Sequence, residues 1–112
     1  MNILFASSEA TPFAQSGGLG EVAGALPKAL VEKGEDVRVV LPLYECVGED
    51  KRKDMQFLFH FDVPVAWRSQ YCGVFKATAN NVTYYLLDNE YYFKRPGLYG
   101  YYDDAERFTF FS

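Results

Sequence analysis

Apolar residues in the first half of the chain follow a strand–helix–strand order. An apolar run at about residues 2–7 precedes a polar loop, and a helical pattern then runs from about Gly18 to Lys33 before the terminator Gly34. The apolar stripe of this helix consists of Leu19, Val22, Ala23, Leu26 and Leu30. A second apolar run, Val37–Leu41, lacks alternation, as in a strand covered on both faces. The pattern predicts a right-handed βαβ unit with two buried parallel strands and the stripe facing the core.

The second half changes to a period of two. Alternation over residues 57–65 predicts a half-exposed strand, and residues 71–79 and 82–87 predict two more strands around the turn dipeptide Asn80-Asn81. One face of the first strand carries Phe57, Phe59, Phe61, Val63 and Val65. The other face carries His60, which we expect at the surface. A last helix begins near Asp103 or Asp104, with Ala105, Phe108 and Phe111 along one face, and the chain ends within it at Ser112.

Composition narrows the class of protein. Of the 112 residues, 49% are hydrophobic, which excludes a disordered chain, and no apolar run approaches the ~18 residues of a membrane span. A net charge of −4 disfavours general binding to nucleic acid or anionic membranes. Met1 leads directly into a strand without a secretory pattern, so we expect a cytoplasmic protein with Cys46 and Cys72 reduced. The sequence has no motif with metal-ligand spacing, and no cofactor is expected.

The stretch Gln15–Val22 carries the most chemical information. It places Gly17 and Gly18 at the start of a helix, where each glycine costs roughly 1 kcal/mol relative to alanine. A protein tolerates this cost for one of two reasons: the turn needs a positive φ, or the backbone must approach another group closely. A helix N-terminus also attracts anions such as phosphate. A tight strand-to-helix turn without a ligand is the alternative interpretation.

A dinucleotide fingerprint is the nearest competing motif, because Gly18-x-Gly20-x-x-Ala23 fits G-x-G-x-x-A. In that fingerprint the first glycine lies at the strand end, whereas here about ten residues intervene. The acidic residue expected near the end of the second strand is also misplaced, because Glu35 and Asp36 precede it. The context therefore disfavours a dinucleotide-dependent oxidoreductase.

Six stretches along the chain carry a more specific resemblance. They are Ser8-Glu9-Ala-Thr-Pro12-Phe13-Ala-Gln15-Ser16-Gly17-Gly18-Leu19-Gly20-Glu21-Val22, Gly24-Ala-Leu-Pro-Lys-Ala-Leu30, Trp67-Arg-x-Gln-Tyr71, Asp88-Asn89-x-Tyr91-x-Phe93, Arg95-x-Gly97-Leu-Tyr-Gly100 and Asp104-x-Glu106-Arg107-Phe108. Together they resemble the amino terminus of bacterial glycogen synthases and plant starch synthases, whose hallmark is K-x-G-G-L-x-D-V. Two positions depart from it: Gln15 replaces the lysine and Glu21 replaces the aspartate.

The resemblance implies an α/β fold: a Rossmann-like parallel sheet from the N-terminal part of a two-domain GT-B glycosyltransferase, with an inserted β-hairpin region. It implies a retaining transfer of glucose from ADP-glucose, or from UDP-glucose, to an α-1,4-glucan. The backbone of Gly17 and Gly18 is expected to meet the diphosphate, Gln15 to flank the phosphates, and Glu21 to face the sugar or acceptor.

The resemblance also implies that residues 1–112 are part of the first domain and that the nucleotide-binding second domain is absent. We therefore expect no catalytic residue in this chain, no activity from the chain alone, and self-association through uncovered aromatic groups. The alternatives are a complete small domain and a non-catalytic carbohydrate-binding module. A module of that kind is suggested by the aromatic-rich second half, where Tyr99, Tyr101 and Tyr102 are candidate glucan contacts.

Overall fold

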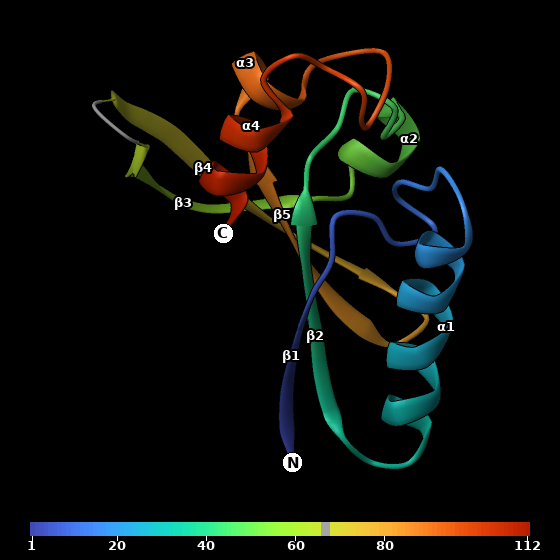
Figure 1. Cartoon of the computed structure of the whole chain (residues 1–112). Helices are drawn as coiled ribbons and strands as arrows, with labels where there is room; N and C mark the ends of the chain where they lie inside the picture. The colour runs from blue at the N-terminus through green and yellow to red at the C-terminus, as the bar shows by residue number, and fades with distance from the viewer. Residues whose placement is uncertain (66–67) are drawn as a thin grey trace.

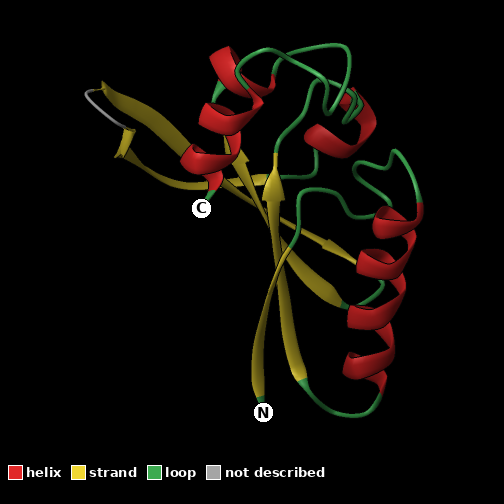
Figure 2. Cartoon of the chain, viewed as in Figure 1, coloured by secondary structure: helices red, strands yellow, loops and turns green. Residues whose placement is uncertain are grey.

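The computed structural model describes residues 1–65 and 68–112, which form one five-stranded sheet with helices on both faces (Figures 1 and 2). The strands are β1 (Asn2–Ala6), β2 (Asp36–Pro42), β3 (Gln56–Val65), β4 (Arg68–Ala79) and β5 (Val82–Asp88). The helices are α1 (Gly18–Glu32), α2 (Glu49–Arg52), α3 (Glu90–Phe93) and α4 (Asp104–Phe111). The spatial order of the strands is β1-β2-β5-β4-β3. The predicted mixed α/β fold with a hairpin insertion is confirmed.

The predicted βαβ unit is present. β1 and β2 pair in parallel and α1 connects them; Gly34 follows the C-terminus of α1, and its φ of +89° suits glycine. β5 then pairs in parallel with the other side of β2, so the sheet has three parallel strands. One expectation was wrong: β1 is not buried, and the side chain of Leu4 is 68% exposed. β1 lies at the edge of the sheet, where β2 is its one hydrogen-bonded neighbour among the described strands.

The face of α1 that packs on the sheet also differs from the prediction. Leu19, Val22 and Leu26 are 50%, 55% and 43% exposed, whereas Ala23 is fully buried. The buried residues of α1 are Gly20, Ala23, Gly24 and Pro27. These follow an i, i+3, i+4, i+7 pattern of small or compact residues, so the helix backbone approaches its neighbours closely. Gly24 shows this best, because a Cβ there would lie 1.9 Å from Thr11 Oγ1.

β3 and β4 form a long antiparallel hairpin that projects beyond α4 (Figure 1). The predicted turn at Asn80-Asn81 is confirmed, with φ values of 52° and 64°. The predicted common face of β3 was wrong in part. A register shift pairs Phe57 with Phe75 but Phe59 with Val74, so Phe57 lies on the opposite face from Phe59. Because β3 is an edge strand, Phe57, Phe59 and Phe61 remain about half exposed, and His60 is exposed as expected.

The C-terminal segment covers the upper part of the sheet face opposite α1. Within α4, Phe110 and Arg107 are buried, whereas Ala105 is exposed and Phe111 is half-buried, so the predicted face is rotated. Phe110 packs against Tyr92 and Phe93 of α3, with ring centroids 5.2 and 6.0 Å apart. The end of the chain is therefore anchored by aromatic contacts.

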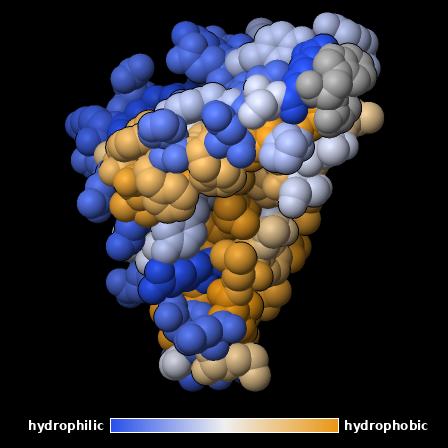
Figure 3. Space-filling model, turned by 90° about the vertical axis from the view of Figure 1, so that its left-hand side faces the viewer, coloured by the Kyte–Doolittle hydropathy of each residue, from blue (hydrophilic) through white to orange (hydrophobic). Residues whose placement is uncertain are grey.

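The lower part of this face has no covering helix within the described residues. Leu4 pairs with Arg38, and Val40 pairs with Ala6 and Tyr85, so these side chains share the face opposite α1. Apolar side chains gather on this side of the molecule in a band toward the end where the chain begins (Figure 3). Both cysteines are free. No helix in the described part of the chain is long and apolar enough to cross a bilayer.

Candidate functional site

The candidate site lies in the glycine loop, residues 15–20, where the chain enters α1 beside the carboxyl end of β1 (Figure 1). Ligands of open parallel sheets bind outside this edge of the sheet. The loop is tied to the preceding segment by a hydrogen bond of 3.0 Å from the Thr11 N–H to the Gly20 carbonyl. The other anchor of the loop is Glu9, a residue for which the sequence suggested no role.

Glu9 places a buried carboxylate beneath the glycine loop, with the side chain only 2% exposed. Its Oε1 accepts the backbone N–H groups of Ser16, Gly17 and Gly20 at 3.2, 3.2 and 2.9 Å. Its Oε2 accepts the hydroxyls of Ser16 at 2.7 Å and Tyr99 at 2.6 Å. The positive end of α1 therefore already carries an anion from within the chain.

This hydrogen bonding decides the protonation state of Glu9. Burial alone would raise the pKa of the carboxyl group, but hydrogen bonds from Tyr99, Ser16 and Gly20 outweigh burial and lower the pKa to about 2. Burial, together with the same contact to Glu9, raises the pKa of Tyr99 to about 12. Glu9 is thus ionised and Tyr99 protonated across the physiological range.

Three backbone N–H groups of the loop, those of Gln15, Gly18 and Leu19, have no acceptor within the described chain, and two of them lie at the start of α1. Among the hydrogen bonds of residues 1–65 and 68–112, none uses the N–H of Gly18 or Leu19, and both residues are exposed. A Cβ at Gly17 or Gly18 would meet nothing within 4 Å, and Gly17 has an extended φ of −171°. Neither a strained turn nor a close contact within the described chain explains these two glycines.

The remaining predicted site residues surround these donors. Gln15 is exposed, and its Nε2 donates to the Gly17 carbonyl at 3.5 Å, so the side chain folds over its own loop. A Cβ at Gly20 would lie 2.8 Å from Gln15 Cγ, so Gly20 makes room for this side chain. Glu21 is exposed in the first turn of α1. The structure therefore brings Gln15, Gly17, Gly18 and Glu21 together on one solvent-facing loop and helix start.

Two arginine–aspartate ion pairs stabilise the conformation of the segment that contains Tyr99. Arg95 contacts both carboxylate oxygens of Asp103 at 2.6 and 2.9 Å. The fully buried Arg107 contacts Asp104 at 2.7 Å, and Asp104 in turn accepts the N–H of Gly100 at 2.8 Å. Charge-assisted pairs of this kind fix geometry as well as adding energy. They hold Tyr99 so that its hydroxyl reaches both Glu9 and Ser8 Oγ, the latter at 2.7 Å.

The other aromatic candidates are arranged differently. Tyr102 is 93% exposed, whereas the ring of Tyr101 has the guanidinium carbons of Arg95 and Arg107 at 4.9 and 4.8 Å from its centroid. Trp67, which carries part of the family resemblance, lies outside the described residues. No sequence signal links Tyr99 to Glu9, because 90 positions separate them.

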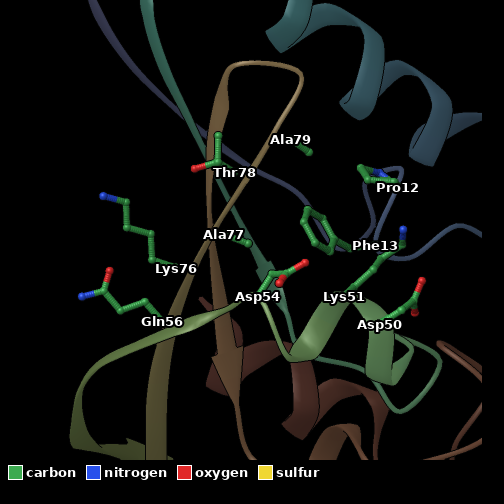
Figure 4. A pocket seen from close by; sticks show the side chains of 10 residues that line it. All are labelled: Pro12, Phe13, Asp50, Lys51, Asp54, Gln56, Lys76, Ala77, Thr78 and Ala79. Atoms are coloured by element: carbon green, nitrogen blue, oxygen red, sulfur yellow. The ribbon is translucent and has the colours of Figure 1, made fainter.

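A hollow of about 590 Å³ lies away from the glycine loop, between the segment before α1, the α2 region and β4. Figure 4 shows charged and polar side chains around it, including Asp50, Lys51 and Lys76. Its aromatic residue, Phe13, is only 7% exposed. None of the predicted site residues lines this hollow. The part of the chain that the structure describes has no group of three or more side chains arranged to hold a metal ion.

Comparison with known proteins defines the class. Residues 2–112 match the starch synthase catalytic domain family, and the chain belongs to this family. The catalytic domain of starch synthase IV from Arabidopsis thaliana, solved with ADP and acarbose bound, superimposes with a TM-score of 0.85 at 29% identity. That match covers 98% of this chain and 23% of the other, and it agrees with the expected GT-B architecture.

Among individual relatives, the glycogen synthases of Lactobacillus acidophilus, Caldicellulosiruptor saccharolyticus and Clostridium beijerinckii are 54%, 57% and 58% identical. Each match covers the whole of this chain. The chain spans 23–24% of the length of these relatives.

Proposed function

We propose that the chain is the amino-terminal part of a glycogen synthase. The whole protein transfers glucose from ADP-glucose to the non-reducing end of an α-1,4-glucan with retention, and residues 1–112 form part of its first domain. Family membership over residues 2–112 and the glycogen synthase relatives support this proposal. The nucleotide-binding second domain and the catalytic groups lie outside this chain. The cytoplasmic location expected from the sequence belongs to the same proposal.

One observation supports the glycine loop as the nucleotide-sugar contact. Gly17 and Gly18 have open space where a side chain would stand, and the N–H groups of Gly18 and Leu19 have no partner within the described chain. A diphosphate approaching the start of α1 would use both features, because it needs backbone donors and room to come close. Gln15 flanks the phosphates and Glu21 faces the sugar or the acceptor.

A chimeric enzyme tests this proposal. In the Caldicellulosiruptor saccharolyticus glycogen synthase, 57% identical, the matched segment is replaced by this chain, and glucose incorporation into glycogen is measured with ADP-glucose and with UDP-glucose. We expect activity with ADP-glucose in the chimera and none in the same enzyme lacking the segment. A folded chimera that is inactive with both donors would contradict the proposal.

The alternative of a carbohydrate-binding module predicts glucan binding without the glycine loop. The 590 Å³ hollow gives it little support, because its one aromatic ring is almost fully buried. Maltooligosaccharide titration of the isolated chain, compared with a Tyr102→Ser variant, tests this alternative directly. Tight binding that is lost with Tyr102 would favour the module.

A further inference from the structure

We propose that Glu9 is a positioning residue: its carboxylate is the internal anion that holds the glycine loop, and it leaves the N–H groups of Gly18 and Leu19, at the start of α1, for a bound diphosphate. This inference rests on the proposed function, because it assumes that the loop meets a diphosphate. It assigns a role to a side chain that itself touches no substrate.

The contacts of Glu9 divide the loop donors into two sets. Oε1 takes the N–H groups of Ser16, Gly17 and Gly20, all within 3.2 Å, so these donors face inward. Gly18 and Leu19 lie between Gly17 and Gly20 in the chain and are exposed. A short carboxylate that binds residues on both sides of Gly18 and Leu19 fixes the backbone so that their N–H groups remain available.

The negative charge of Glu9 has a second consequence. A helix N-terminus carries roughly half a positive charge, and one ionised carboxylate more than cancels it. The loop therefore offers a diphosphate oriented donors without net positive charge. Cations that bind the diphosphate must come from elsewhere, because Gln15 is neutral and Glu21 is acidic.

Tyr99 extends this role to a second loop. Its hydroxyl donates to Glu9 Oε2 at 2.6 Å and contacts Ser8 Oγ at 2.7 Å, so residues 97–103 are fastened to the glycine loop through one carboxylate. The groups that face Glu9 are neutral hydroxyls and backbone N–H groups, with the buried Tyr44 nearby. No arginine or lysine pairs with Glu9 among the described ion pairs.

Two substitutions of Glu9 separate geometry from charge. In Glu9→Gln the amide oxygen still accepts the backbone N–H groups, and its NH₂ group can donate to the Ser16 and Tyr99 hydroxyls. This variant keeps the loop geometry and removes the charge. Glu9→Ala removes both. The exposed Glu32, at the far end of α1, provides a matched control, because Glu32→Gln removes the same charge about 20 Å away.

The experiment measures amide hydrogen exchange of the 112-residue chain and then titrates the chain with ADP. Both steps are monitored by ¹H–¹⁵N NMR at low salt. Without ligand, the Gly17 and Gly20 N–H groups should be protected in wild type and in Glu9→Gln, and unprotected in Glu9→Ala. With ADP, Gly18 and Leu19 should shift most. Glu9→Gln should tighten ADP binding about two- to tenfold, whereas Glu9→Ala should abolish the Gly18 and Leu19 shifts.

The outcomes are distinguishable. If Glu9 were purely structural, both Glu9→Gln and Glu9→Ala would bind ADP more weakly than wild type. If ADP shifted the Gly17 and Gly20 signals as strongly as that of Gly18, the ligand would be displacing Glu9. Either result overturns the inference. If Glu9→Ala does not fold, wild type and Glu9→Gln still decide it. A wild-type chain that binds no ADP counts against the glycine loop as the nucleotide contact of the proposed function, and the ligand-free exchange pattern then decides whether Glu9 holds the loop.

Discussion

At the residue scale, the candidate site was only partly predictable. Gly17 and Gly18 were singled out because glycine is unfavourable at a helix start, and Gln15 because it replaces the lysine of the family pattern. Their contact with a diphosphate stays a prediction. The role of Glu9 could not be predicted, because its hydroxyl partner Tyr99 comes from the far end of the chain. A buried carboxylate that accepts several N–H and O–H groups is a product of tertiary structure, and no local pattern encodes it.

Glu9 should make stability depend on acidity. Its pKa in the folded chain is about 2, below the ordinary value of 4.5, so the folded state binds the proton more weakly. The resulting stabilisation, of order 3 kcal/mol, is fully present above about pH 4.5 and is lost as the pH falls toward 2. Urea unfolding at about pH 6 and pH 3 measures it.

Glu9→Gln supplies the comparison for this prediction, because Asp103 and Asp104 also have lowered pKa values and contribute to acid sensitivity. The free energy of unfolding should fall more between the two pH values in wild type than in Glu9→Gln. Parallel losses in the two proteins would show that Glu9 titrates normally.

Gln15 should limit nucleotide-sugar binding. A lysine at this position would add a full charge beside the diphosphate, and charge-assisted hydrogen bonds contribute roughly 1.5–3 kcal/mol against about 1 for neutral ones. In the chimeric synthase, Gln15→Lys should tighten ADP-glucose binding by up to ~1–2 kcal/mol, most clearly at low salt. Calorimetric titration of wild type, Gln15→Lys and Gln15→Ala tests this. Equal affinities in all three would remove position 15 from the site.

At the element scale, the sequence predicted the order and type of the main helices and strands, but it predicted several buried faces wrongly. The apolar stripe of α1 suggested that Leu19 and Val22 face inward, yet the compact residues of the helix pack instead. Hydrophobic periodicity identifies an element, but its buried face depends on which neighbours approach it. The register shift at Phe57 likewise depends on pairing with β4, which periodicity cannot reveal.

Gly24 is the residue on which the packing of α1 depends. An added Cβ would lie 1.9 Å from Thr11 Oγ1 and 2.9 Å from the Thr11 carbonyl oxygen, so Gly24→Ala must displace the loop or the helix. Despite the better helix propensity of alanine, we expect a net destabilisation of about 1–3 kcal/mol in urea unfolding. Gly18→Ala, with nothing within 4 Å, is the matched control and should be neutral or slightly stabilising. Equal effects of the two substitutions would contradict the packing described for α1.

At the scale of the whole molecule, the proposed function predicts that this chain alone is inactive. Catalysis between two domains depends on holding reactants between opposed walls, a contribution of up to ~7–11 kcal/mol. The chain spans about a quarter of its glycogen synthase relatives. We therefore expect the purified 112-residue chain to transfer no glucose from ADP-glucose to glycogen, measured by radiolabel incorporation. Glucan extension above the level of a buffer blank would disprove this.

The uncovered apolar surface should make the isolated chain self-associate. The sequence suggested the C-terminal aromatics as the cause, but Phe110 is only 3% exposed, whereas Leu4 and Phe59 are 68% and 53% exposed on the sheet face opposite α1. Parallel sheets are normally covered on both faces, and exposed apolar patches of a few hundred Å² tend to associate. Sedimentation velocity over a range of concentrations should show dimers or larger species.

Two substitutions locate the surface responsible for this association. Leu4→Ser and Phe59→Ser should each weaken it, because each removes apolar area from the uncovered face. Tyr102→Ser is the matched control: its side chain is 93% exposed and belongs to the segment between α3 and α4, not to a strand of the sheet, so it should change nothing. A wild-type chain that stays monomeric at every concentration would contradict the prediction. Association that all three variants retain equally would assign it to another surface, for which the exposed Val22 and Leu26 of α1 are the next residues to change.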